Sequence, residues 1–128
     1  MAMQGSQSVA TDETQDLIAS DKVEGTAVYN RAGEKLGSIH TLMIDKISGK
    51  VAYAVLSFGG FLGIGDRYHP LPWRVLTYDT GMGGYTVDLD RSVLEGAPTY
   101  ASSEIPDWGD RRWGEQLHQY YGARPYWE

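Results

Sequence analysis

Residues 51–73, VAYAVLSFGGFLGIGDRYHPLPW, decide the fold of this chain. Side chains alternate between the two faces of a strand, and residues 51–58 carry apolar side chains on both, as expected for a strand covered on both sides. The glycines that follow allow sharp bends. Pro70 and Pro72 confine the next strand to a sheet edge or a corner, because proline has no N–H to donate. The stretch therefore predicts two strands joined by a bent loop.

Further strand-like segments lie on both sides of this stretch: residues 26–30, 36–45, 74–79 and 85–90. The apolar alternation slips between Ile39 and Leu42, which predicts a bulge or a strong bend. The connections are too short for the crossovers that parallel neighbours need. We therefore predict a mainly β fold, a small antiparallel β-barrel of about six strands. Leu56 and Trp73 are expected to help fill it, and Trp73→Ala to cost roughly 3–5 kcal/mol if Trp73 is buried.

Composition divides the chain into three parts. Residues 1–20 are mostly polar and lack periodicity, so we expect a flexible N-terminal arm. The barrel domain is expected over residues 21–97, with one helical turn near its end at 91–97. Residues 98–128 form an extension rich in tryptophan and tyrosine.

The extension carries the signals of a short helix near residues 108–121. Asp107 is the predicted N-cap, and Gly122 is the predicted C-terminal stop. One face of this helix carries a stripe at helical spacing: Trp113, Leu117 and Tyr120 or Tyr121. A helix this short is stable only when such a stripe docks on another surface.

Composition and charge exclude several classes of function. The chain has 128 residues and no cysteine, so disulfides, thiolate metal sites and cysteine nucleophiles are ruled out. The net charge is −6, and no basic stripe is available for a phosphate backbone, so general nucleic-acid binding is not expected. The N-terminal residues do not resemble a secretory signal, and the longest apolar run is too short to cross a bilayer. We expect no membrane span and a cytoplasmic location.

The glycine-rich loop invites comparison with phosphate-binding loops. Its order, Gly60-x-x-Gly63-x-Gly65, reverses the dinucleotide fingerprint and leads into a strand instead of a helix. The G-K-[ST] signature of a Walker loop is absent. We expect a structural corner whose apolar side chains pack on their own barrel or on a partner: Phe61, Leu62 and Ile64.

The titratable residues after the loop form no recognisable catalytic set. Asp66 and Arg67 are expected to pair locally, with His69 facing solvent on an edge strand. The histidines lack the spacing of metal ligands: His40, His69 and His118. No G-x-S-x-G nucleophile elbow is present. We therefore predict no enzyme activity, no cofactor and no metal site.

Three segments together resemble the PRC-barrel domain family: GTAVYNRAGEKLGSI at residues 25–39, IDKISGKVAY at 44–53 and GDRYHPLPW at 65–73. The resemblance covers about residues 22–94 and is closest to stand-alone bacterial members. It implies a small β-barrel similar to the cytoplasmic domain of the H subunit of purple-bacterial photosynthetic reaction centres. It is also similar to the C-terminal domain of a ribosome-maturation factor. In both settings the barrel contacts other proteins, and the family supplies no catalytic motif.

The expected function is a non-enzymatic protein-interaction or scaffold module that self-associates, as a homodimer, through the barrel and the aromatic tail. Two alternatives stay open: a ribosome-assembly role by fold analogy, and a small-molecule or metal-binding barrel. The candidate partner-contact residues are Phe61, Leu62, Ile64, Trp108, Trp113, Leu117, Tyr120, Tyr121 and Trp127.

Overall fold

The computed structural model describes residues 17–58, 67–101, 104 and 106–128. The expected arm over residues 1–20 lies largely outside them, as does the glycine-rich loop at residues 59–66. The described strands are β1 (Ala27–Asn30), β2 (Lys35–Ile44), β3 (Val51–Phe58), β4 (Arg67–Pro72), β5 (Thr77–Asp79), β6 (Gly84–Val87) and β7 (Tyr100–Ala101). The helices are α2 (Ser20–Val23), the 3-10 turn η2 (Trp73–Val75), α3 (Arg91–Glu95) and α4 (Arg111–Tyr121).

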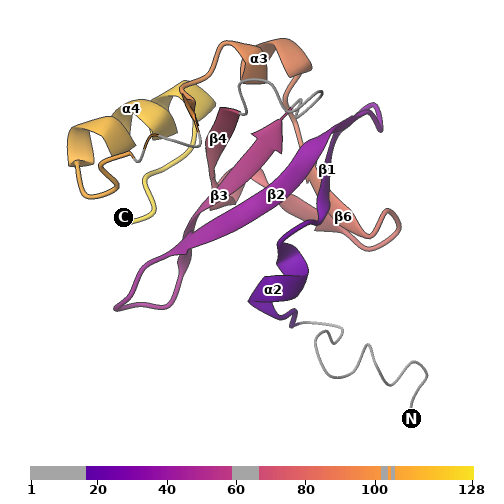
Figure 1. Ribbon diagram of the computed structural model, residues 1–128, viewed down its shortest axis with the longest axis horizontal. Helices are drawn as coiled ribbons and strands as arrows, with labels where there is room; N and C mark the ends of the chain where they lie inside the picture. Colours follow the sequence, from indigo (N-terminus) through magenta and orange to yellow (C-terminus); the bar gives the residue numbers. More distant parts are fainter. Residues whose placement is uncertain (1–16, 59–66, 102–103, 105) are drawn as a thin grey trace.

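The strands form one seven-stranded sheet in the order β5-β6-β1-β2-β3-β4-β7 (Figure 1). All neighbouring pairs are antiparallel except β1 and β6, which run parallel with Val28 opposite Tyr85. The prediction of a mainly β, mostly antiparallel fold is confirmed, although short connections did not prevent a parallel pair. The chain between β1 and β6 contains four other strands, and these provide the length that a crossover needs.

The sheet is not closed into a barrel by hydrogen bonds, because β5 and β7 stand at opposite ends of the strand order. Each end strand is very short, so little backbone is available for a closing ladder. Helical segments cover the core instead: Leu94 of α3 and Leu117 and Tyr121 of α4 are buried in the same cluster as the strand residues. The enclosure is therefore completed by side-chain packing.

The local irregularities follow the sequence. The pairing of β2 with β3 shifts register between Ile39 and Thr41, which confirms the predicted bulge. In the β2–β3 turn, the Asp45 carboxylate accepts the N–H groups of Ile47 at 2.8 Å and Ser48 at 3.1 Å. These bonds lower the pKa of Asp45, and Gly49 ends the turn with a φ of 78°.

The predicted C-terminal helix is present as α4, with a different N-cap. The Asp110 carboxylate accepts the N–H of Arg112 at 2.9 Å, whereas Asp107 accepts the N–H of Gly109 in the preceding turn. The prediction that Asp107 is the N-cap was therefore wrong. Two aspartates of equal capping ability precede the helix, and Asp110, directly before Arg111, is the one that caps it. Gly122 ends α4 in the left-handed conformation with a φ of 67°, as predicted.

The two predicted core residues differ in burial. Leu56 is 1% exposed and lies in the centre of β3. Trp73 is only partly buried, since the chain leaves the sheet after Pro72 and enters η2. Its ring packs on the edge of Tyr85 at 5.4 Å between centroids. Pro70 and Pro72 lie beyond the two residues of β4 that pair with β7, so the edge position predicted for them is confirmed.

Leu56→Ala is expected to lower the free energy of unfolding by roughly 2–5 kcal/mol, because it leaves a cavity in a fully packed site. Trp73→Ala is expected to lower the free energy of unfolding by about 1–2 kcal/mol, less than the roughly 3–5 kcal/mol expected for a fully buried ring, because part of the ring is already in water. Urea unfolding followed by circular dichroism measures both. Met82→Ala, at a side chain 40% exposed in the turn between β5 and β6, is the control and should be near neutral. A Leu56→Ala protein as stable as this control contradicts the assignment of the core.

Candidate functional site

Tyr53 of β3 is the point at which the aromatic tail docks. Its ring is 2% exposed. The ring centroids of four tail residues lie within 6 Å of it: Trp108 at 5.6 Å, Trp113 at 5.8 Å, His118 at 5.4 Å and Tyr126 at 5.5 Å. Burial raises the pKa of the Tyr53 hydroxyl, followed by the influence of Tyr126. The tail therefore packs on the sheet of its own chain.

The buried face of α4 contains the predicted stripe, with Tyr121 as its last member, and also includes Gly114 and His118. Leu117 and Tyr121 are buried, and Trp113 is partly buried. Burial raises the pKa of Tyr121, whose hydroxyl has no partner among the described residues. Tyr120 is 42% exposed, and its hydroxyl donates to the Val93 carbonyl at 2.7 Å.

Trp127 folds back over α4 after the chain leaves the helix. Its ring lies over Gly114, where an added Cβ would come within 3.1 Å of the indole. The Arg111 guanidinium stacks on the same ring at 4.3 Å from the centroid. His118 lies 5.5 Å from it, in a tilted arrangement close to edge-on. Glycine at position 114 is what allows this close approach.

The candidate contact residues therefore fall into two groups. Those of the loop, Phe61, Leu62 and Ile64, lie outside the described residues. Those of the tail, namely Trp108, Trp113, Leu117, Tyr120, Tyr121 and Trp127, all lie on or beside α4. The structure shows what each tail residue touches within the chain, and a contact with a second chain stays a prediction. Among the described aromatic residues of the tail, Tyr120 keeps the largest exposed fraction.

Sequence reasoning missed an apolar group at the far end of the β2–β3 hairpin, which we call the hairpin tip: Leu42, Met43, Ile44 and Ile47. Ile44 is 48% and Ile47 96% exposed, whereas Leu42 and Met43 are partly buried and pack against the core. Figure 1 shows this hairpin projecting away from the rest of the sheet. The signal was present in the sequence, because three consecutive apolar residues break the alternation of a half-buried strand.

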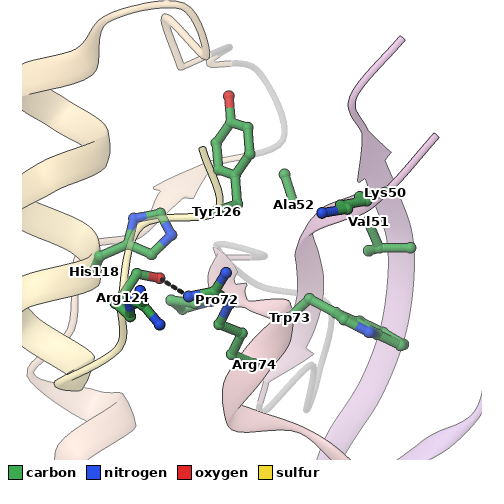
Figure 2. A pocket seen from close by; sticks show the side chains of 9 residues that line it. All are labelled: Lys50, Val51, Ala52, Pro72, Trp73, Arg74, His118, Arg124 and Tyr126. Carbon is green, nitrogen blue, oxygen red and sulfur yellow. Dashed lines mark hydrogen bonds between the residues drawn. The ribbon is translucent and has the colours of Figure 1, made fainter. Parts of the chain in front are cut away.

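A cavity of about 240 Å³, which we call the tail cavity, lies where the tail meets the sheet (Figure 2). Its polar lining consists of Lys50, Arg74, His118 and Arg124, and Ala52, Pro72 and Tyr126 contribute apolar surface. These residues come from the start of β3, from β4 and η2, and from the tail. No local sequence pattern predicted this cavity, since only the docked tail brings its lining residues together.

The prediction that His69 faces solvent was wrong. Instead of facing solvent, it is 3% exposed within β4, opposite Leu56 of β3. Burial lowers the pKa of His69 to about 4, and the nearby charge of Arg67 adds to the effect. Asp66, the expected partner of Arg67, lies outside the described residues. Among the described residues, Arg67 contacts Glu104 at 3.7 Å.

No group of three or more His, Cys, Asp or Glu side chains in the described ranges is placed to hold a metal ion. No helix in the described part of the chain is long and apolar enough to cross a membrane.

Taken together, the bent seven-stranded sheet and its docked helical tail define a small, mainly β domain whose accessible features are surfaces and an open cavity. A model of the PRC-barrel domain family matches residues 15–94. The match spans more than half of the chain, so the chain belongs to the PRC-barrel domain family, as the sequence resemblance predicted. A search of curated proteins found no match. The matched region ends within α3, and the aromatic tail lies beyond it.

Tyr53→Ala is expected to release the tail from the sheet and to cost roughly 3–5 kcal/mol of unfolding free energy, because a buried ring with four aromatic neighbours is lost. Limited proteolysis after Arg111 and Arg112 and tryptophan fluorescence report the release. Tyr53→Phe keeps the ring and is the matched control. Equal protection of the tail in wild type and Tyr53→Ala contradicts this docking.

Stability is expected to depend on pH through His69. Its folded-state pKa of about 4 lies below its ordinary value of 6.5, so the unfolded chain binds the proton more readily. The contribution of neutral His69 to the free energy of unfolding is fully present above pH 6.5 and is lost as the pH falls towards 4. The loss is on the order of 3 kcal/mol. Urea midpoints across this window, compared between wild type and His69→Gln, isolate the effect from that of the carboxylates. Parallel curves for the two proteins contradict a buried neutral His69.

Proposed function

We propose that this protein is a non-enzymatic interaction module that self-associates as a homodimer through its barrel domain, with the tail supporting that surface. The observation that carries the proposal is the hairpin tip, where Ile47 is 96% and Ile44 48% exposed. Single exposed apolar residues are ordinary, whereas two large ones close together in sequence on a projecting hairpin favour a contact site.

The chemistry of the hairpin tip suits a second copy of the same chain. Asp45 and Lys46 place opposite charges directly beside the apolar group, and both are exposed or partly so. When two identical tips meet about a two-fold axis, Asp45 of one copy can face Lys46 of the other while the isoleucines pack together. A partner of uniform charge would satisfy only one of the two side chains.

The tail has an indirect role in this proposal. In this proposal, residues 21–97 form the barrel domain and residues 98–128 form the extension. The extension covers Tyr53, which lies on the strand that follows the hairpin tip. Burial of this strand holds the hairpin in one orientation, which lowers the entropy cost of a contact at its tip. Tyr120, with 42% of its surface exposed, remains the tail residue best placed for a direct contact.

The test is sedimentation velocity over a concentration series with the full chain. Wild type is expected to dimerise, and Ile44→Glu/Ile47→Glu is expected to raise the dimer dissociation constant by roughly tenfold or more, because two like charges would be buried at the interface. Circular dichroism confirms that the variant is folded.

Met82→Glu is the matched control, since Met82 is 40% exposed on the turn between β5 and β6, away from the hairpin tip. This variant should dimerise as wild type does. A wild type that stays monomeric at all concentrations, or a double variant that dimerises unchanged, overturns the proposal.

A further inference from the structure

We propose that a pocket between β7 and the start of α4 binds a basic, proline-rich segment of another protein in the polyproline II conformation. The pocket, which we call the β7 pocket, has a volume of about 220 Å³. None of the hairpin-tip side chains lines it, so the inference is independent of self-association. The lining that carries the proposal consists of Pro70, Pro98, Tyr100, Glu104, Pro106 and Trp113.

The walls of the β7 pocket are rings with few backbone donors. Three of its lining residues are prolines, whose nitrogen carries no hydrogen, and Tyr100 and Trp113 add a phenol and an indole. Both aromatic side chains are partly exposed. Proline-rich segments dock in grooves lined by aromatic rings, because their extended helix is already formed before binding and little conformational entropy is lost.

The aromatic surface continues beyond the pocket as a row of rings. Trp108 packs between Trp113, at 5.3 Å between ring centroids, and Tyr100, at 6.0 Å. Tyr100 in turn lies 5.5 Å from Tyr68, and all four side chains are partly exposed. A polyproline II helix rises about 3.1 Å per residue, so a segment of a few residues is long enough to contact more than one ring. The row therefore suits an extended segment better than a compact small molecule.

The two aromatic side chains of the pocket also carry polar groups that the chain leaves unused. Neither the Tyr100 hydroxyl nor the Trp113 N–H has a hydrogen-bond partner among the described residues, and neither belongs to the fully buried polar atoms there. Burial raises the pKa of Tyr100, which keeps its hydroxyl protonated. A polyproline II segment makes no internal hydrogen bonds, and its prolines have no N–H. Donors on the wall therefore meet a backbone that consists mainly of acceptors.

The charge around the β7 pocket favours a basic segment. Residues 98–110 carry three carboxylates and no lysine or arginine. Glu104 is already 3.7 Å from Arg67, so it offers little to an occupant. Asp107 is exposed, directly follows the lining residue Pro106, and has no ion-pair partner in the part of the chain that the structure describes. A lysine or arginine beside the prolines of the bound segment would pair with Asp107.

The experiment is a titration of the full chain with an acetylated oligoproline peptide that ends in two lysines. Two-dimensional NMR follows the indole N–H signals of Trp108 and Trp113, and calorimetry gives the dissociation constant. Saturable shifts centred on the β7 pocket are expected. The mirror-image peptide of D-residues has the same composition and charge but a helix of the opposite hand. It is the matched control peptide and should bind at least tenfold more weakly.

Variants of the chain separate the ring, the hydroxyl and the charge. Tyr100→Ala should weaken binding by about tenfold or more, because an aromatic wall is lost. Tyr100→Phe keeps the ring and should weaken it by roughly fivefold, because one donor is lost. Asp107→Asn should weaken it by a few-fold, and less at high salt.

Two further variants are the matched controls and should bind as wild type does. Tyr78→Ala removes a ring that is 37% exposed on β5, at the opposite end of the strand order from β7. Asp90→Asn removes an exposed carboxylate that does not line the β7 pocket.

Equal binding of the two mirror-image peptides overturns the proposal, because an apolar surface without the geometry for polyproline II would not distinguish them. The absence of saturable shifts at millimolar peptide overturns it as well. Shifts of the same size with lysine amide alone would mean that the pocket attracts any cation, and would also contradict a proline-rich partner. If Tyr100→Ala fails to fold, Tyr100→Phe and the two peptides still decide the question.

Discussion

The burial of β3 on both faces is the constraint on which the rest of the structure depends. One face carries Leu56, which is covered by the bent sheet, and the other carries Tyr53, which the sheet alone leaves open. A small open sheet cannot cover both of its own faces, so a second layer is required. The aromatic tail supplies that layer, and Tyr53 is the residue around which it is organised.

Docking of the tail has consequences beyond stability. It brings His118 of α4 and Arg124 of the following segment to the same cavity as Lys50, which directly precedes β3, and Arg74 of η2. His118 and Arg124 are far in sequence from Lys50 and Arg74. The tail cavity therefore exists only while the tail is docked on the sheet. The same docking buries most of the aromatic surface that a partner could otherwise use, which leaves the hairpin tip as the larger exposed apolar group.

The features that the sequence predicted are those set by local chemistry. The slip of alternation after Ile39 identified the bulge, Gly122 marked the end of α4, and the spacing of Trp113 and Leu117 identified the docked face of the helix. Each of these depends on residues within one or two turns of chain. The joint spacing of the family segments extended this reading to the fold class, which the match over residues 15–94 confirms.

The features that were missed depend on contacts between distant segments. His69 resembles an edge-strand residue in the local sequence pattern, whereas in the structure it lies opposite Leu56 of β3, on a strand that α4 also contacts, and is buried. The parallel pairing of β1 with β6 and the exit of Trp73 from the sheet likewise depend on contacts between segments that are distant in sequence. The tail cavity is the extreme case, because its lining comes from residues that are unremarkable one by one: a lysine after a turn, an arginine in a 3-10 helix and an arginine after a helix stop. Only a packed second layer makes a site of them, so a PRC-barrel protein with a different tail is expected to lack this cavity even where its barrel is the same.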